Sequence, residues 1–110
     1  MARLQVITLE ELLEMQVNDD EFTRVAALPR KAFDEGHIPG AVNIPMEHVA
    51  ENAETHLDNE DTVVVYCQNY ACKASGVVAG KLLKLGYEDT VDFAAGKDGW
   101  TDAGFELETG

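Results

Sequence analysis

The feature that most constrains this sequence is a continuous β-branched run that ends at a cysteine. Residues 61–66 read Asp-Thr-Val-Val-Val-Tyr, and Cys67 follows directly. A strand with one solvated face alternates apolar and polar residues, whereas this run is apolar at every position from Val63 onward. We therefore predict a strand that is buried on both faces, in the centre of a mostly parallel sheet.

The rest of the chain alternates short β-rich segments with helical segments, which favours an α/β fold with right-handed crossovers. Thr8, followed three residues later by Glu11, is the capping-box pattern that begins a helix. Gly86 supplies a stop for a later helix whose apolar residues fall at helical spacing. The predicted strands are 4–7, 22–27, 61–66 and 90–93, with a short strand within 36–45, and the predicted helices begin at 8, 29, 46, 74 or 75, and 97.

The length of 110 residues matches one domain, and the sequence shows no internal repeat, low-complexity tract or linker. We therefore expect a single domain over residues 1–110. No apolar run approaches the roughly 18 residues that cross a bilayer, and the first residues lack the apolar core of a signal peptide. These features predict a cytoplasmic protein in which the two cysteines are reduced.

The charge balance is strongly acidic, with 21 Asp and Glu against 8 Lys and Arg and a formal net charge of −13. Nucleic acid and anionic membranes are therefore not expected as partners. The acidic residues are scattered and predict a solvated surface that repels itself at low salt. Adaptation to high salt is one interpretation, and an ordinary acidic protein is the other.

Cys67 is the residue that carries candidate chemistry. It stands between the predicted central strand and a helix that begins near Ala74, with the loop Gln68–Lys73 in between. Ligands bind at the carboxyl ends of strands in open α/β sheets, and a helix start offers free N–H groups and a positive dipole end. That environment favours thiolate, the nucleophilic form of cysteine. The alternative is that Cys67 is a small hydrophobic residue at a strand end.

Three segments resemble the signatures of rhodanese-like domains and occur in that family's order. Residues 36–45 read Gly-His-Ile-Pro-Gly-Ala-Val-Asn-Ile-Pro, residues 63–67 read Val-Val-Val-Tyr-Cys, and residues 94–100 read Ala-Ala-Gly-Lys-Asp-Gly-Trp. The resemblance extends from about Ile7 to Gly104. It implies a parallel sheet with helices on both faces and a cysteine cradled in the loop after the central strand.

The resemblance also implies a sulfurtransferase in which Cys67 is the nucleophile and persulfide carrier. Its partners would be a small-molecule or protein sulfur donor, such as thiosulfate or a persulfide, and a thiol or other thiophilic acceptor. No metal or organic cofactor is expected. Backbone N–H groups of the loop would stabilise the persulfide anion. The residues of this anion-binding loop are Gln68, Asn69, Tyr70, Ala71, Cys72 and Lys73.

The sequence departs from the family pattern at two points. Many members carry an Asp-Val-Arg run where this chain has Ala26 and Leu28 in the charged positions. The loop is also poor in cations, with Lys73 alone, so thiosulfate is expected to be a weak donor. These departures keep open a rhodanese-like module that is weakly active or inactive and serves in binding or sulfur relay.

Cys72, five residues after Cys67, is a candidate resolving thiol that would attack a Cys67 persulfide or sulfenic acid and form a disulfide. A thiol redox protein that uses this pair is a third hypothesis, and a loop cysteine without a role is the alternative. A cysteine phosphatase or arsenate reductase is disfavoured, because Lys73 stands where such enzymes place arginine and Tyr66 where they usually have histidine.

The other candidate residues are assigned mainly to structure. His37 lies in a Gly-Pro turn and is expected to fix the path of the chain rather than act as a base. Trp100 is expected in the core. Tyr70 either shapes access to the loop or is an exposed aromatic residue. His48 and His56 do not form a zinc-binding pattern.

Overall fold

The computed structural model describes residues 4–18 and 21–110, and within them it shows a five-stranded, fully parallel sheet. The order of the strands is β1-β5-β4-β2-β3. The predicted central position of the β-branched run is therefore confirmed, since β4 lies in the middle. The strands are β1 (Gln5–Val6), β2 (Thr23–Ala26), β3 (Val42–Asn43), β4 (Val63–Tyr66) and β5 (Thr90–Phe93).

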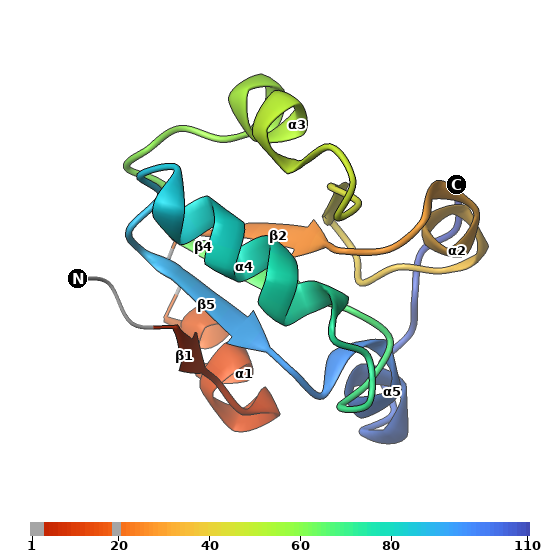
Figure 1. Cartoon of the computed structure of the whole chain (residues 1–110). Helices are drawn as coiled ribbons and strands as arrows, with labels where there is room; N and C mark the ends of the chain where they lie inside the picture. The colour runs from red at the N-terminus through yellow and green to blue at the C-terminus, as the bar shows by residue number, and fades with distance from the viewer. Residues whose placement is uncertain (1–3, 19–20) are drawn as a thin grey trace.

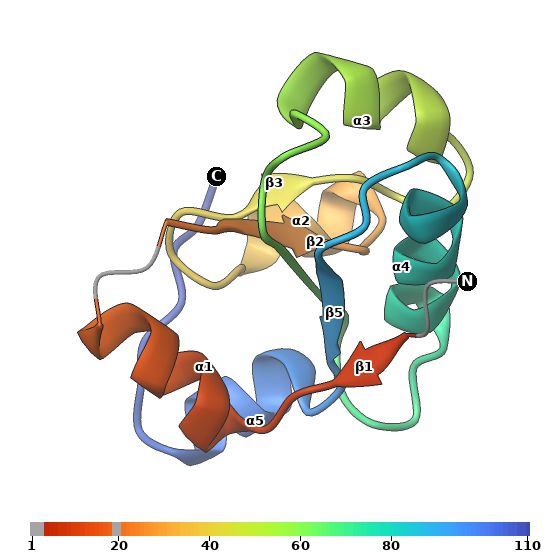
Figure 2. The ribbon, with the colours of Figure 1, turned by 90° about the vertical axis from the view of Figure 1, so that its left-hand side faces the viewer.

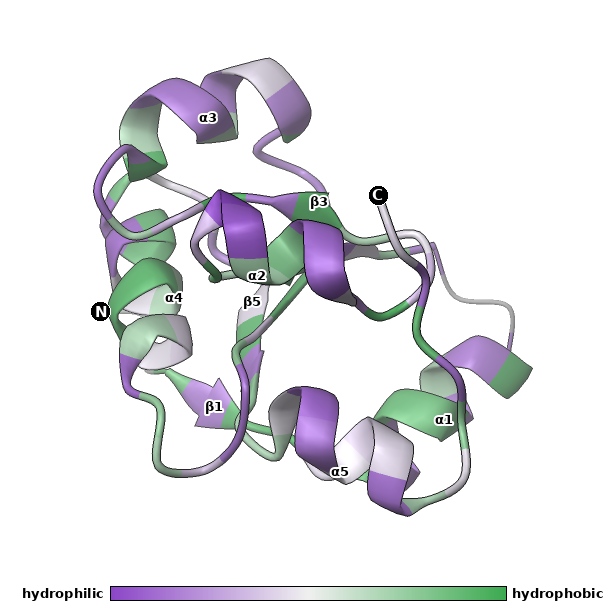
Figure 3. Ribbon diagram, turned by 90° about the vertical axis from the view of Figure 1, so that its right-hand side faces the viewer, coloured by the Kyte–Doolittle hydropathy of each residue, from purple (hydrophilic) through white to green (hydrophobic). Residues whose placement is uncertain are grey.

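Five helices within the same residues cover the two faces of the sheet. Figures 1 and 2 show α3 and α4 on one side and α1 and α5 on the other, which confirms the predicted α/β architecture. In Figure 3, α2 and α3 carry mainly hydrophilic residues, as expected for helices at the surface. The helices are α1 (Leu9–Val17), α2 (Arg30–Glu35), α3 (Val49–His56), α4 (Ala74–Lys84) and α5 (Gly96–Asp102).

The side chains of β4 alternate between two hydrophobic clusters. Val63 and Val65 pack in the cluster that contains α3 and α4, while Val64 and Tyr66 pack with α1, α2 and α5. All four are buried, so the strand contributes to the core on both faces. This is the reason that its sequence is apolar throughout instead of alternating.

Some element boundaries differ from those predicted. Thr8 caps α1 with the expected capping box, in which its side chain accepts from the Glu11 N–H. The helix predicted from residue 46 instead begins at Val49, because residues 46–48 form a turn whose His48 N–H donates to the Pro45 carbonyl. The first strand is shorter than predicted, with two residues on the edge of the sheet.

Trp100 is buried, as predicted, and His37 is buried as well. The His37 ring stacks on Phe33 with 3.9 Å between centroids, and its Nδ1 lies 2.9 Å from the Phe33 carbonyl oxygen. The Trp100 indole N–H donates to the Glu106 carbonyl. In the part of the chain that the structure describes, no helix is long and apolar enough to cross a membrane, and no three His, Cys, Asp or Glu residues group as metal ligands.

Candidate active site

Cys67 lies at the carboxyl end of the central strand. It follows Tyr66, which pairs with Ala26 of β2 on one side and Phe93 of β5 on the other. The carboxyl ends of three parallel strands therefore meet at this point, where α/β sheets bind ligands. The cysteine is nearly covered, with 3% of its surface exposed.

The loop from Gln68 to Lys73 returns the chain from β4 to α4 and brings the two cysteines together. A disulfide joins Cys67 to Cys72, with 6.2 Å between their Cα atoms. The structure thus contains the oxidised pair, whereas the sequence led us to expect reduced thiols. The loop therefore brings Cys72 beside Cys67.

Asn69 organises the loop from within. The Ala71 N–H donates to its side-chain oxygen at 3.0 Å, and the Cys72 N–H donates to its backbone carbonyl at 3.1 Å. Two of the six N–H groups predicted to hold an anion are therefore engaged inside the loop. The N–H groups of Gln68, Asn69, Tyr70 and Lys73 remain as candidates for holding an anion.

The start of α5 is bonded to the cysteine loop by four hydrogen bonds. The Lys97 N–H donates to the Cys67 carbonyl at 3.0 Å, and the Asp98 N–H donates to the Gln68 carbonyl at 2.9 Å. The Asp98 carboxylate accepts from the Gln68 side-chain amide at 2.8 Å and from the Asn69 amide at 2.9 Å. These side-chain bonds hold the pKa of Asp98 below its usual range.

Gly96, Lys97 and Asp98 are site residues that the sequence reasoning missed. They lie in the segment 94–100, which we used only as a family signature. The signal that would have found them is the pairing of β5 with β4, because the carboxyl ends of neighbouring parallel strands meet at one edge of the sheet. Pairing of β4 with β5 could not be read from the chain order alone.

The charges around the site are few. Lys73 is exposed, while Lys97 is 8% exposed and its ammonium nitrogen lies 3.4 Å from the Ala32 carbonyl oxygen. Ala26 and Leu28, which replace the charged residues of the family pattern, are buried in the core. Their carbonyl groups both accept from the side-chain amide of Asn43, at 3.2 and 2.7 Å.

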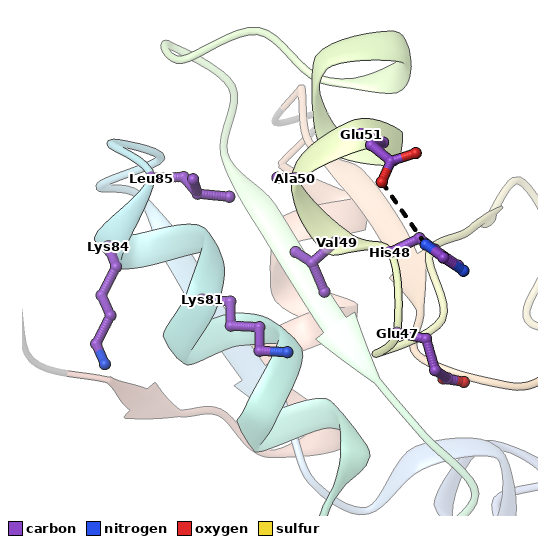
Figure 4. A pocket seen from close by; sticks show the side chains of 8 residues that line it. All are labelled: Glu47, His48, Val49, Ala50, Glu51, Lys81, Lys84 and Leu85. Atoms are coloured by element: carbon purple, nitrogen blue, oxygen red, sulfur yellow. Dashed lines mark ion pairs between the residues drawn. The ribbon is translucent and has the colours of Figure 1, made fainter.

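Tyr70 stands on the outside of the loop, with 75% of its surface exposed. A separate groove of about 340 Å³ lies between α3 and the later turns of α4, with Lys81, Lys84 and Leu85 lining it from the α4 side and residues 47–51 from the other side (Figure 4). None of the residues that line this groove belongs to the cysteine loop. The Lys81 ammonium already donates to the Met46 carbonyl at 3.1 Å.

Comparisons with known proteins agree with the fold and extend it to a family. The family model described as "Rhodanese-like domain" matches residues 8–103. A 67-residue stretch is 36% identical to the thiosulfate sulfurtransferase PspE of Escherichia coli (strain K12), covering 60% of this chain and 62% of that protein. A 66-residue stretch is 36% identical to the HTH-type transcriptional regulator Rv0324 of Mycobacterium tuberculosis, covering 60% of this chain and 28% of the regulator.

Among solved structures, the BH2092 protein from Bacillus halodurans superposes with a TM-score of 0.85 at 24% identity, over 96% of this chain and 77% of that one. The chain spans less than two thirds of the length of the curated relatives that it matches. The molecule is thus an α/β protein with a cysteine at the end of a strand. Its parallel sheet is covered on both faces, and a cysteine loop follows the central strand. Within that class, the chain belongs to the rhodanese-like domain family.

Proposed function

We propose that this protein is a sulfurtransferase in which Cys67 carries a sulfane sulfur as a persulfide. The position of Cys67 carries the proposal: it ends the central strand, and its loop leads directly into the first turn of α4. The relative named as a thiosulfate sulfurtransferase supports the same chemistry. A free thiol is needed first, so the Cys67–Cys72 disulfide must be reduced by an external dithiol before a cycle begins.

In the first step, the Cys67 thiolate attacks the outer sulfur of the donor. The S–S bond of the donor breaks, and its remainder leaves with the electron pair, as sulfite from thiosulfate or as a thiolate from a persulfide. The Cys67 persulfide anion that forms would be held by the free N–H groups of the loop. In the second step, an acceptor thiolate attacks the outer sulfur, and Cys67 leaves as thiolate.

Cys72 offers a second outcome for the persulfide. Attack of the Cys72 thiolate on the Cys67 sulfur breaks the persulfide bond, releases hydrosulfide and forms the disulfide seen in the structure. The sulfane sulfur is thereby reduced to sulfide, while the two cysteines are oxidised by two electrons. External thiols would then restore the reduced pair.

The charges near the loop favour donors of low charge. The Asp98 carboxylate bonds to the two residues that follow Cys67, while Lys73 is exposed at the far end of the loop. Dianionic thiosulfate would approach a loop that already carries a fixed negative charge. A persulfide of a small thiol is therefore the expected better donor.

The proposal is tested by following sulfur transfer to cyanide and to a thiol after reduction of the protein. With a thiol persulfide as donor, we expect turnover that Cys67→Ser abolishes. Cys72→Ser is the matched control, because it removes a loop cysteine of the same size and should retain transfer. Equal activity of the two variants, or no activity in folded wild type, would contradict the assignment of Cys67.

A thiol redox protein is the second candidate, and the Cys67–Cys72 disulfide is the observation that favours it. In that case Cys72→Ser should abolish disulfide cycling while persulfide formation at Cys67 survives.

A binding module is a further alternative, consistent with the apolar Ala26 and Leu28 and with the match to part of a transcriptional regulator. That module would form no persulfide with either donor.

A further inference from the structure

We propose that Asp98 is a positioning residue that sets how readily Cys67 and Cys72 form their disulfide. The hydrogen bonds of the Asp98 carboxylate are to Gln68 and Asn69 and not to either sulfur atom. It acts through Gln68 and Asn69, the two residues that connect Cys67 to the outer half of the loop. The proposal does not rest on sulfurtransferase activity, because it concerns only the equilibrium between the dithiol and the disulfide.

Asp98 fixes the first half of the loop through its backbone and its side chain. Its N–H donates to the Gln68 carbonyl at 2.9 Å, and its two carboxylate oxygens accept separately from the amides of Gln68 and Asn69. Each carboxylate oxygen thus has one loop residue as its partner. Hydrogen bonds to an ionised acceptor are stronger than neutral ones, so these contacts restrict the loop more than ordinary turn bonds.

Asn69 transmits this restraint to Cys72. Its side-chain amide nitrogen donates to Asp98, while its side-chain oxygen accepts from the Ala71 N–H. Its backbone carbonyl accepts from the Cys72 N–H at 3.1 Å. A continuous chain of hydrogen bonds therefore runs from α5 through Asn69 to the second cysteine, so the position of Cys72 depends on the Asp98 carboxylate.

The physical consequence is a coupling between the carboxylate and the disulfide. Both restrain the same loop conformation, so each reduces the entropy that is lost when the other forms. With Asp98 present, the reduced loop already holds Cys72 near Cys67, which gives the pair a high effective concentration. Without it, the reduced loop samples more conformations, and closing the disulfide becomes less favourable.

The test is a redox titration of the purified protein in glutathione buffers. In the reaction measured, the dithiol and oxidised glutathione exchange to give the protein disulfide and two reduced glutathione molecules. We expect Asp98→Ala to lower the equilibrium constant for disulfide formation by about tenfold, since two bonds to a charged acceptor are lost. The matched control is Asp102→Ala, which removes an exposed acidic residue of the same helix.

A general loss of stability would change the thermal midpoint but not this equilibrium constant. An equilibrium constant within twofold of wild type in folded Asp98→Ala, or an equal decrease in Asp102→Ala, would overturn the proposal. Asn69→Ala interrupts the same series of hydrogen bonds without altering α5. It replaces Asp98→Ala in the titration if Asp98→Ala fails to fold. We expect a decrease in the same direction, and in the double variant a decrease smaller than the product of the two single effects.

Discussion

Gly96 packs directly against the backbone of Cys67. A Cβ atom on Gly96 would overlap the Cys67 carbonyl group and come within 2.8 Å of the Gln68 carbonyl carbon. Gly96 also has a φ of +63°, in the left-handed region that side chains disfavour. Two segments 29 residues apart in the chain thus meet at the site because this position has no side chain.

Gly96→Ala is expected to lower the free energy of unfolding by about 2 kcal/mol or more, because a backbone clash adds to left-handed strain. Chemical denaturation of the reduced protein measures this change. Gly104→Ala is the control, since Gly104 also has a positive φ but has open space around its Cβ position. It should cost only about 1 kcal/mol. If the two variants lost the same free energy of unfolding, the close contact between Gly96 and the Cys67 backbone would contribute nothing to the cost of Gly96→Ala.

The Tyr66 hydroxyl accepts the backbone N–H of Ile38 at 2.9 Å, and burial raises the pKa of this hydroxyl above its usual range. Tyr66→Phe removes the acceptor and leaves a buried N–H without a partner. We expect a loss of about 1–3 kcal/mol in the free energy of unfolding. Tyr87→Phe, at another buried tyrosine, should cost less. A Tyr66→Phe variant as stable as wild type would mean that water or another group satisfies this N–H.

Asp92 is a buried carboxyl on β5 whose Oδ1 atom has no hydrogen-bond partner among the described residues. Burial raises its pKa, and a hydrogen bond from Ser75 partly opposes the rise. A carboxyl with a raised pKa binds its proton more tightly in the folded state. Its ionised form therefore costs stability as pH rises above the unfolded-state pKa of about 3.9.

We accordingly expect Asp92→Asn to be more stable than wild type at pH 7, by about 1 kcal/mol. The difference should shrink as pH falls toward 4, where the wild-type carboxyl is increasingly protonated in both states. Urea denaturation at the two pH values measures it, with the exposed Asp102→Asn as the control. A variant that is less stable at pH 7 would contradict the burial argument.

The acidic surface is expected to make stability depend on salt. Among the described residues, one ion pair joins an arginine to a carboxylate: Arg30 pairs with Asp34 at 3.0 Å. The other pairs involve histidines. Most of the 21 acidic residues thus repel one another. We expect the thermal midpoint to rise by about 5 °C or more between low salt and 1 M NaCl. A midpoint that is unchanged or lower in salt would contradict this expectation.

The sequence predicted the elements whose local signals agree with their place in the fold. The β-branched run of β4 and the capping box of α1 are two such cases, because a buried strand and a helix start each require particular residue types. The position of Cys67 at the end of β4 followed from the same run. The start of α3 was placed three residues early, since the turn after Pro45 has no distinct signal.

The contacts between α5 and the cysteine loop could not be predicted, because they depend on β5 lying beside β4. Nothing in the residue types of Lys97 or Asp98 indicates that their N–H groups bond to a loop some thirty positions earlier. The same holds for Asn43, which satisfies two carbonyl groups at the end of β2. Polar contacts between distant segments depend on the order of the strands in the sheet, and local sequence patterns do not reveal that order.

The most direct measurement is intact-mass spectrometry of the reduced protein after brief exposure to a thiol persulfide, and separately to thiosulfate. We expect a gain of one sulfur, about 32 Da, in Cys72→Ser, where no second thiol can release it, and no such gain in Cys67→Ser. The gain should be larger with the persulfide than with thiosulfate. Folded Cys72→Ser protein that gains no mass from either donor, or a Cys67→Ser variant that gains the same mass, would contradict the assignment of Cys67 as the sulfur carrier.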